Sequence, residues 1–331
     1  MAAEIPKINP LAESVFSIEN EEQFRQIAWQ VYKFQFRHNE LYRQYCTLLG
    51  KNPDNGRVVE DIPFLPISFF KTHEVKTTDF EPEAVFSSSG TTGAQTSRHF
   101  VKELSLYRRS FFEGFERFFG APQQYCILGL LPSYLERTGS SLIYMVEALV
   151  EKSGHPASGF YLYDHEKLAD TLEKLESEKQ PAILFGVSFA LLDFAEKYAM
   201  PLRHVRVVET GGMKGRREEM SKAALYETLQ TAFQQPVIWS EYGMTELLSQ
   251  AWAENGRYRC PPWMKVLLRE ETDPFSYSRG AGALNIIDLA DLYSCSFIAT
   301  DDRGRLLDDG SFEVSGRLDN SDVRGCSQLV L

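Results

Sequence analysis

Four short segments of this sequence combine glycine with residue types that bind phosphate, ribose or a metal ion. The first is Ser87–Gly93 (SSSGTTG), which follows an expected strand at residues 84–88. Its small residues allow the backbone to approach a polyphosphate closely, and its hydroxyl groups add hydrogen-bond donors. It is not a Walker loop, since GxxxxGKS/T is absent. A polyphosphate-binding loop and a flexible surface turn are both open interpretations of this segment alone.

Two further segments follow expected strands, namely Glu209–Gly215 (ETGGMKG) and Trp239–Glu246 (WSEYGMTE). Ligands of open α/β sheets bind at the carboxyl ends of strands, where such glycines let flat groups lie against the backbone. In the latter segment Tyr242 offers a ring for stacking on a base, Thr245 a hydroxyl for a phosphate and Glu246 an oxygen ligand for Mg²⁺. The alternative for Glu246 is an ordinary acid at a helix N-terminus.

A fourth segment, Thr300–Gly304 (TDDRG), is followed by Gly316 and Arg317. Its carboxylates could hold a ribose diol, and the guanidinium of Arg317 could hold a phosphate. The alternative is that these acids are solvated turn residues. Each segment is a weak signal by itself, and the order of all four along the chain carries the information.

The elements that would position these segments alternate between strands and helices. Short apolar runs rich in β-branched residues predict strands, and the longer periodic stretches between them predict helices. This alternation predicts an α/β fold with a largely parallel sheet. The expected strands are residues 125–131, 182–187, 205–210 and 236–243, and the expected helices are residues 102–119, 140–152, 165–179, 188–198 and 214–233.

Both ends of the chain differ from this central pattern. Apolar residues at helical spacing predict a long helix or a helix pair over residues 21–49, followed by an extended segment at 61–71. The last part predicts a small β-rich subdomain, with acidic turns such as DDRG and DDG between strands at 264–268, 281–287, 295–300 and 312–315. We therefore expect an N-terminal helical segment packed on the core at 1–82, an α/β core at 83–262, and the β-rich part at 263–331.

Composition and charge argue against several classes of protein. The 331 residues carry a formal net charge of −11, which disfavours general binding to nucleic acid or to anionic membranes. The N-terminus lacks the pattern of a signal peptide, and no apolar run reaches the roughly 18 residues needed to span a bilayer. We expect a cytoplasmic protein with no nucleic-acid partner and no stable membrane insertion. The cysteines lack the spacing of a zinc site or a disulfide framework, and they are Cys46, Cys126, Cys260, Cys295 and Cys326.

In this order, the four segments resemble the motifs of the adenylate-forming superfamily, which includes acyl-CoA synthetases and aryl-CoA ligases. SSSGTTG resembles its phosphate loop, ETGGMKG its adenine-side loop, YGMTE its Thr/Glu motif, and TDD with GR its ribose-binding aspartate and following arginine. The resemblance implies ATP and Mg²⁺ as cofactors, and a fold of the superfamily's N-terminal type with mainly parallel sheets flanked by helices. It implies a metal ligand at Glu246, catalytic roles for Thr245 and Arg317, and ATP or AMP binding by Ser87, Ser88, Ser89, Gly90, Thr91, Thr92, Gly93, Gly211, Gly212, Met213, Glu241, Tyr242, Gly243, Met244, Thr245, Asp302 and Arg317.

The sequence departs from the superfamily pattern in two places. The lysine that usually follows the phosphate loop is missing, and Arg98 and Lys102 are the nearest candidates to replace it. The sequence also stops shortly after GRLDN. We therefore expect the superfamily's mobile C-terminal domain, which carries a lysine important for adenylation, to be absent.

The ending of the sequence, residues 316–331, resembles one branch of the superfamily, the acyl-protein synthetases of the LuxE type. In that branch a cysteine near the C-terminus accepts the acyl group from the adenylate before its transfer to a partner reductase. Cys326 stands at that position, and Arg324 nearby would favour the thiolate that must attack. The alternative for Cys326 is a small buried hydrophobic residue.

We therefore expect an ATP-dependent acid–thiol ligase. The resemblance implies that it converts a carboxylic acid, a fatty acid in this branch, to acyl-AMP and then forms a thioester on Cys326. The acyl group would pass to a partner protein, either a reductase or a carrier. Two alternatives are open: an acyl- or aryl-CoA or carrier-protein ligase completed by a separate domain, and a degenerate nucleotide- or acyl-binding subunit.

Overall fold

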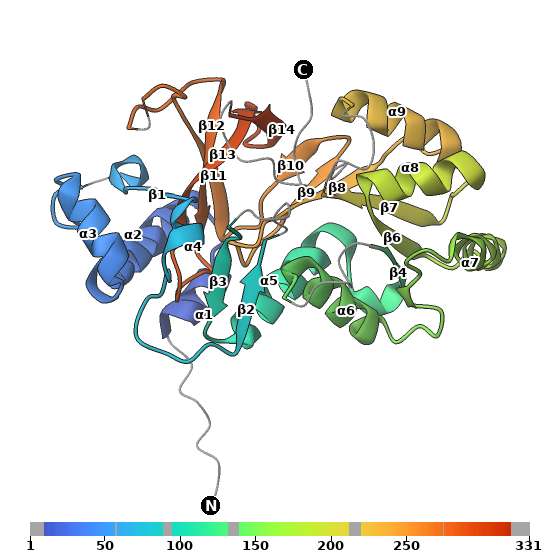
Figure 1. Cartoon of the computed structure of the whole chain (residues 1–331), viewed down its shortest axis with the longest axis horizontal. Coiled ribbons are helices and arrows are strands. Elements are labelled where there is room, and N and C mark those ends of the chain that lie inside the picture. The colour runs from blue at the N-terminus through green and yellow to red at the C-terminus, as the bar shows by residue number, and fades with distance from the viewer. Residues whose placement is uncertain are drawn as a thin grey trace, which may run out of the picture.

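A twelve-stranded mixed sheet runs through the protein in the computed structural model (Figure 1), which describes residues 10–56, 58–88, 95–131, 139–211, 220–273 and 275–318. The strand order is β11-β12-β13-β14-β10-β9-β8-β7-β6-β4-β5, and β1 pairs with β13 outside this path. The strands are β1 (Leu65–Pro66), β4 (Cys126–Leu130), β5 (Gly159–Phe160), β6 (Ala182–Val187), β7 (Val205–Thr210), β8 (Trp239–Tyr242), β9 (Ala251–Glu254), β10 (Arg257–Arg259), β11 (Met264–Arg269), β12 (Ala281–Asp288), β13 (Phe297–Leu306) and β14 (Phe312–Arg317).

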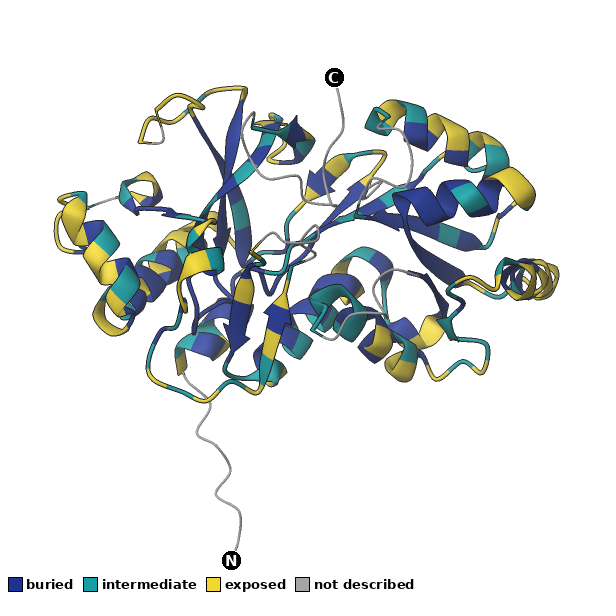
Figure 2. Cartoon of the chain, in the orientation of Figure 1, coloured by how far each residue is buried: buried dark blue, intermediate teal, exposed yellow. Residues whose placement is uncertain are grey.

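One part of this sheet is parallel, as the alternating pattern predicts. Strands β5, β4, β6, β7 and β8 are parallel neighbours. Helices cover both faces of this part of the sheet, so β4 and β6 are buried along their whole length (Figure 2). This burial explains why the sequences of these two strands are continuous apolar runs. The helices here are α5 (Leu104–Phe119), α6 (Ser141–Ser153), α7 (His165–Glu178), α8 (Ser188–Lys197) and α9 (Lys222–Phe233).

From β8 to β11 the neighbours along the main strand order are antiparallel, so the prediction of a mainly parallel sheet is wrong beyond β8. Strands β8 and β9 are antiparallel. The pairs that follow in the strand order are antiparallel too: β9 with β10, β10 with β14, β14 with β13, β13 with β12, and β12 with β11. The predicted β-rich part is present, but its strands continue the same sheet. The expected acidic turn DDRG lies inside β13, because residues 302–304 pair with β14 and residues 303–304 also pair with β12.

Strands β9 and β10, which the sequence reading missed, form a hairpin. Asn255 and Gly256 connect them with φ angles of 49° and 82°. A two-residue turn with positive φ at both positions matches the right-handed twist of its strands, and Asn-Gly is its preferred sequence. This dipeptide is therefore the signal that could have predicted the hairpin.

The N-terminal part forms the expected helix pair, α2 (Glu21–His38) and α3 (Glu40–Leu48), after a short α1 (Pro10–Phe16). Asn39 separates the pair: its N–H donates to the Gln35 carbonyl at the end of α2, and its side chain accepts a hydrogen bond from the Tyr42 N–H to cap α3. The segment expected to be extended at 61–71 instead contains only the short β1 and then enters α4 (Phe69–Thr72). The two 3₁₀ turns are Val59–Asp61 and Pro122–Gln124.

An aromatic cluster attaches this helical part to the sheet. The rings of Tyr32, Tyr42 and Phe64 lie 6.1, 6.2 and 6.2 Å from that of Phe297 on β13. Strand β1 pairs in parallel with the same strand, with Leu65 opposite Ile298. The N-terminal helices therefore pack directly on the strand that carries the TDD segment.

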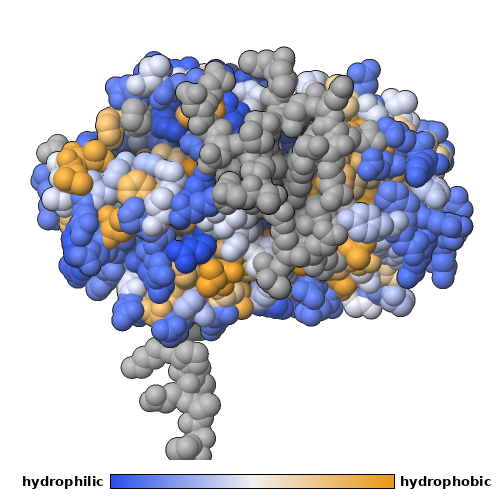
Figure 3. Space-filling view, in the orientation of Figure 1, coloured by the Kyte–Doolittle hydropathy of each residue, from blue (hydrophilic) through white to orange (hydrophobic). Residues whose placement is uncertain are grey.

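The surface of the described residues has scattered apolar side chains. Figure 3 shows apolar groups in separate patches on one face, with polar side chains over α7. Among the described residues, no helix is long and apolar enough to cross a membrane. The exposed large apolar residues come from elements far apart in the sequence, and they are Leu48, Val58, Val85, Tyr163, Phe275 and Tyr277.

Candidate active site

The fold brings the third and fourth sequence segments into direct contact. Tyr242, at the end of β8, donates a hydrogen bond from its hydroxyl to Oδ2 of Asp302 on β13, over 2.7 Å. Arg317 on β14 lies opposite Asp302 in the strand register, and its Nε is 3.4 Å from Oδ1 of the same carboxylate. Asp301 adds a second carboxylate 3.6 Å from Arg317. A phenol, a guanidinium and two carboxylates from distant parts of the chain thus form one cluster.

Burial makes this cluster electrostatically strong. The Asp302 side chain is 9% exposed and that of Arg317 is 6% exposed, so water screens their attraction weakly. Burial and the nearby charge of Asp302 raise the pKa of Tyr242 well above its usual value, so the phenol stays a hydrogen-bond donor. The interpretation of Asp302 as a solvated turn acid is wrong, since this side chain is buried in a strand.

A second cluster lies where β7 ends and the ETGGMKG segment begins. Glu209, only 1% exposed, accepts hydrogen bonds from Ser188 Oγ at 2.5 Å, from Lys222 Nζ at 2.9 Å and from Ser240 Oγ at 3.1 Å. Burial disfavours the charge on Lys222, but Glu209, Tyr258 and Tyr226 together outweigh it and raise the pKa of Lys222 well above its usual value. Lys222 also donates to the Tyr258 hydroxyl over 3.1 Å. This cluster ties α8, α9 and β8 to the end of β7.

The sequence analysis predicts no site role for Ser188 or Lys222. Neither residue belongs to one of the four segments, so the sequence near them gives no sign of this cluster. Gly211, the first glycine of ETGGMKG, follows β7 with a φ of 78°, which glycine adopts readily.

Glu241 occupies the space between these two clusters. Its Oε2 accepts a hydrogen bond from Thr210 Oγ over 2.6 Å. Burial, together with the neighbouring charge of Glu209, raises the pKa of Glu241 to about 7, while the bond from Thr210 opposes this change. A Cβ atom on Gly243 would lie 2.2 Å from Oε1 of Glu241, so glycine at that position leaves the room that the carboxyl group occupies.

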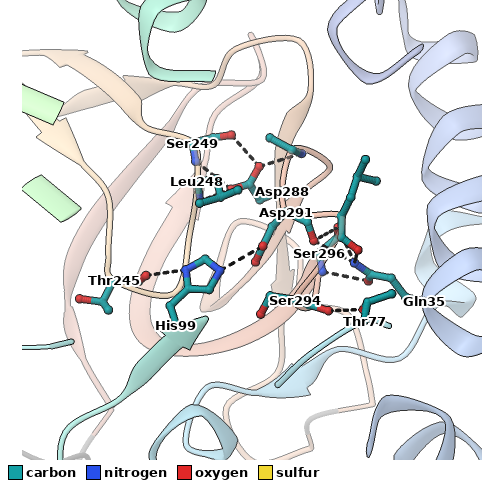
Figure 4. Close-up of polar contacts among 12 residues, drawn as sticks. Gln35, Thr77, His99, Thr245, Leu248, Ser249, Asp288, Asp291, Ser294 and Ser296 are labelled. Carbon is teal, nitrogen blue, oxygen red and sulfur yellow. Dashed lines mark hydrogen bonds and ion pairs between the residues drawn. The ribbon is translucent and has the colours of Figure 1, made fainter. Parts of the chain in front are cut away.

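Thr245 and Glu246 lie in an irregular loop, residues 243–250, that buried polar groups hold in place (Figure 4). The Thr245 carbonyl lies 2.8 Å from Nδ1 of His99, and Asp288 accepts hydrogen bonds from the N–H groups of Leu248 and Ser249. No helix begins at Glu246, so the alternative of an acid at a helix N-terminus is wrong. Met244 precedes Thr245 in this loop, and Glu246 is 1% exposed.

The residues present are compatible with Mg²⁺ held mainly by a substrate. Within the described ranges no group of three or more His, Cys, Asp or Glu side chains could hold a metal ion. Mg²⁺ in nucleotide sites usually keeps several waters and takes one or two protein carboxylates besides the phosphates. Glu246 is the residue for which the sequence predicts such a role.

The described part of the first sequence segment is Ser87 and Ser88, which lie at the end of β2 (Ala84–Ser87); β2 pairs with β3 (Arg98–Val101) in a separate two-stranded sheet. The backbone N–H of Ser97 donates a hydrogen bond to Ser88 Oγ over 2.9 Å. The sequence reading missed β3, because it expected the loop to lead directly into α5. Eight predicted site residues lie outside the described residues: Ser89, Gly90, Thr91, Thr92, Gly93, Gly212, Met213 and Cys326.

Neither candidate for the missing lysine donates to a described carboxylate. The Arg98 guanidinium lies over the Phe100 ring at 5.2 Å, and the Lys102 ammonium lies over the Tyr293 ring at 4.1 Å. Such cation–π contacts hold a side chain without neutralising its charge.

Comparison with known proteins places these features in context. A family model described as acyl-protein synthetase, LuxE, matches residues 5–331. A long-chain-fatty-acid–luciferin-component ligase of Aliivibrio fischeri is 24% identical over 317 residues, which cover 87% of this chain and 81% of that relative.

Solved structures show the same fold at low sequence identity. A 2-hydroxyisobutyryl-CoA ligase in complex with 2-HIB-AMP matches with a TM-score of 0.65 and 13% identity, covering 92% of this chain and 69% of that one. The O-succinylbenzoate coenzyme A synthetase from Bacillus subtilis, in complex with ATP and a magnesium ion, matches with a TM-score of 0.50 and 15% identity over 72% of this chain and 52% of that one.

Proposed function

The chain belongs to the LuxE family of acyl-protein synthetases, and from this premise we propose that it activates a fatty acid with ATP and then carries the acyl group on Cys326. In the first step a carboxylate oxygen of the acid attacks the α-phosphorus of ATP, and pyrophosphate leaves. In the second step the Cys326 thiolate attacks the acyl carbonyl carbon, and AMP leaves. A partner protein then accepts the acyl group. The fatty acid as substrate is supported by the name of the Aliivibrio fischeri relative.

One observation carries the proposal: the contact of Tyr242 and Arg317 with the same carboxylate of Asp302. A buried aspartate can accept hydrogen bonds from both hydroxyls of a ribose, and a guanidinium beside it can form an ion pair with the α-phosphate. Tyr242 donates a hydrogen bond to one oxygen of Asp302, and Arg317 lies within ion-pair distance of the other. The ribose hydroxyls would donate to the same carboxylate beside the Tyr242 hydroxyl, since a carboxylate has about four acceptor sites.

The other predicted residues have roles that suit adenylation. Tyr242 would lie against the adenine, Thr245 and Thr92 would donate hydroxyl hydrogen bonds to phosphate oxygens, and Ser87 and Ser88 would support the phosphate loop. Mg²⁺, with Glu246 as a ligand, would supply charge neutralisation of the phosphates. Catalysis by these residues consists of positioning and charge stabilisation, since the protein forms no bond to the substrate in this step.

The test is to incubate the purified protein with ATP, Mg²⁺ and radiolabelled fatty acids of several lengths. Pyrophosphate release and protein-bound label are followed in wild type, in Cys326→Ala and in the control Cys260→Ala. Cys260 is a partly exposed cysteine whose thiol pKa burial raises to about 12, which makes it a poor nucleophile.

The proposal expects hydroxylamine-sensitive label on wild type and on Cys260→Ala, and none on Cys326→Ala, with pyrophosphate release in all three. Pyrophosphate release without protein label would instead indicate a CoA or carrier-protein ligase. If no acid led to pyrophosphate release, the proposed enzyme activity would be contradicted. A nucleotide- or acyl-binding subunit would then be the better interpretation.

A further inference from the structure

His99 is a buried histidine that the proposed mechanism does not use. It lies on β3, which follows the SSSGTTG segment in the sequence, and the residue is 1% exposed. Both ring nitrogens have a partner: Nδ1 is 2.8 Å from the Thr245 carbonyl oxygen, and Nε2 is 3.1 Å from Oδ1 of Asp291 (Figure 4). A carbonyl oxygen can only accept, so Nδ1 must carry the proton in this contact.

Asp291 is a fixed anchor for the imidazole. Its side chain is 2% exposed, and its backbone carbonyl accepts a hydrogen bond from Gln35 Nε2 over 2.9 Å and another from Ser296 Oγ over 3.1 Å. The edge of the Phe70 ring packs against the imidazole, with the two ring centroids 6.0 Å apart. Phe70 on α4 and Asp291 before β13 therefore contact the ring of His99, and Gln35 on α2 holds Asp291 in place.

The charge balance around His99 favours this arrangement. Burial disfavours the imidazolium, but the carboxylate of Asp291 and the Thr245 carbonyl outweigh it and raise the pKa of His99. When the imidazole is protonated at both nitrogens, it donates to Thr245 and to Asp291 at the same time.

We propose that His99 is a positioning residue for adenylation, because its Nδ1–H···O=C hydrogen bond fixes the peptide plane between Thr245 and Glu246. This inference rests on the proposed function. The orientation of that plane sets the directions in which the Thr245 hydroxyl and the Glu246 carboxylate leave the backbone. The hydrogen bond therefore links β3 to the loop that carries the proposed metal ligand.

The alternative is that His99 and Asp291 only stabilise the core. Two substitutions separate these roles because each keeps one half of the imidazole. In His99→Asn the amide nitrogen takes the place of Nδ1 and keeps the donor to Thr245. In His99→Gln the amide nitrogen takes the place of Nε2 and keeps the partner of Asp291.

The experiment measures pyrophosphate release for wild type and both variants as a function of fatty acid and Mg²⁺ concentration, together with the thermal unfolding midpoint. The positioning role predicts that His99→Asn keeps kcat within roughly threefold of wild type. It predicts that His99→Gln lowers kcat about 10- to 100-fold and raises the Mg²⁺ requirement, with little change in KM for the acid, since misplacement of about 1 Å can cost that much. Equal losses in both variants, or the reverse order, would overturn the inference.

A second measurement observes His99 itself, in the wild-type protein. In wild type with ¹⁵N-labelled histidine, NMR should show a slowly exchanging proton on Nδ1 of the histidine whose signals disappear in His99→Asn. Absence of a proton on that nitrogen at pH 7 would overturn the inference. Failure of wild type to release pyrophosphate with any acid is a different result, because it refutes the proposed function, whereas active wild type with equal variants refutes only the role of His99.

Discussion

Replacement of Glu241 by glutamine should make the protein more stable at alkaline pH. The pKa of Glu241 is about 7 in the folded protein and has an ordinary value of 4.5. Between these two values the folded chain keeps a proton that the unfolded chain has released, so the free energy of unfolding falls as the pH rises through this window. Glutamine carries no charge at any pH and can still accept the hydrogen bond from Thr210.

The size of the effect follows from the same pKa. The interval between 4.5 and about 7 corresponds to about 3 kcal/mol at 1.36 kcal/mol for each pH unit. The side chain of Glu241 is partly exposed, so water screens part of this effect. We therefore expect the free energy of unfolding of Glu241→Gln to exceed that of wild type by about 1–2 kcal/mol at pH 8. Below pH 4.5 both side chains are neutral, and the difference should disappear.

Glu209→Gln is the matched control, since it makes the same chemical change on the neighbouring parallel strand. Glu209 is 1% exposed and pairs with Lys222 at 2.9 Å. Glu209→Gln removes the charged partner of the Lys222 ammonium, which also donates a hydrogen bond to the Tyr258 hydroxyl. We expect a loss of about 3 kcal/mol at pH 8, the lower end of the cost of breaking a buried ion pair.

Urea unfolding followed by tryptophan fluorescence at pH 4.5, 6 and 8 measures all three proteins. The reasoning requires Glu241→Gln to exceed wild type at pH 8 and to match it at pH 4.5, while Glu209→Gln falls below wild type at pH 8. A Glu241→Gln variant that is less stable than wild type at pH 8, or whose difference from wild type does not change with pH, would refute it.

Two other substitutions test the site and the sheet that carries it. Tyr242→Phe removes the donor to Asp302 and should raise KM for ATP about fivefold, the equivalent of one hydrogen bond, with kcat for pyrophosphate release almost unchanged; a fall in kcat alone would contradict the assigned role. Gly304→Ala should destabilise the protein by about 1–3 kcal/mol in urea unfolding and weaken ATP binding in calorimetry, because its Cβ would lie 2.1 Å from the Glu313 carbonyl and force β13 and β14 apart. Gly114→Ala, whose Cβ would meet no atom within 4 Å in helix α5, should instead stabilise slightly, and equal losses at the two glycines would count against this account.

The sequence predicted elements whose own residues determine their structure. Strands β4, β6 and β7 are apolar runs, and α2 and α3 show helical spacing with Asn39 between them. Strand β10, in contrast, has two exposed arginines around Tyr258, and only pairing with β9 and β14 makes it a strand. The sequence of β10 alone therefore does not predict this strand, since its formation depends on partners elsewhere in the chain.

The same distinction holds for the site. Asp302 and Arg317 were predicted through motif order, and the structure brings them together in one strand register. His99 has partners 146 and 192 residues away, and its own neighbours in the sequence give no sign of them. The mixed character of the sheet was missed for a related reason, since strand direction beyond β8 depends on connections rather than on strand composition.

The attachment of the N-terminal helices to β13 has a consequence during translation. Gln35 reaches its partner Asp291 across 256 residues of sequence, and the ring of Tyr32 finds Phe297 only after a similar interval. At roughly 5–20 residues per second, a ribosome needs about 10–50 seconds to produce the missing partner. During that time the aromatic side of α2 is exposed to other nascent chains. We expect this protein to need protection by a chaperone early in synthesis, and its yield to fall when translation slows after the first 70 residues.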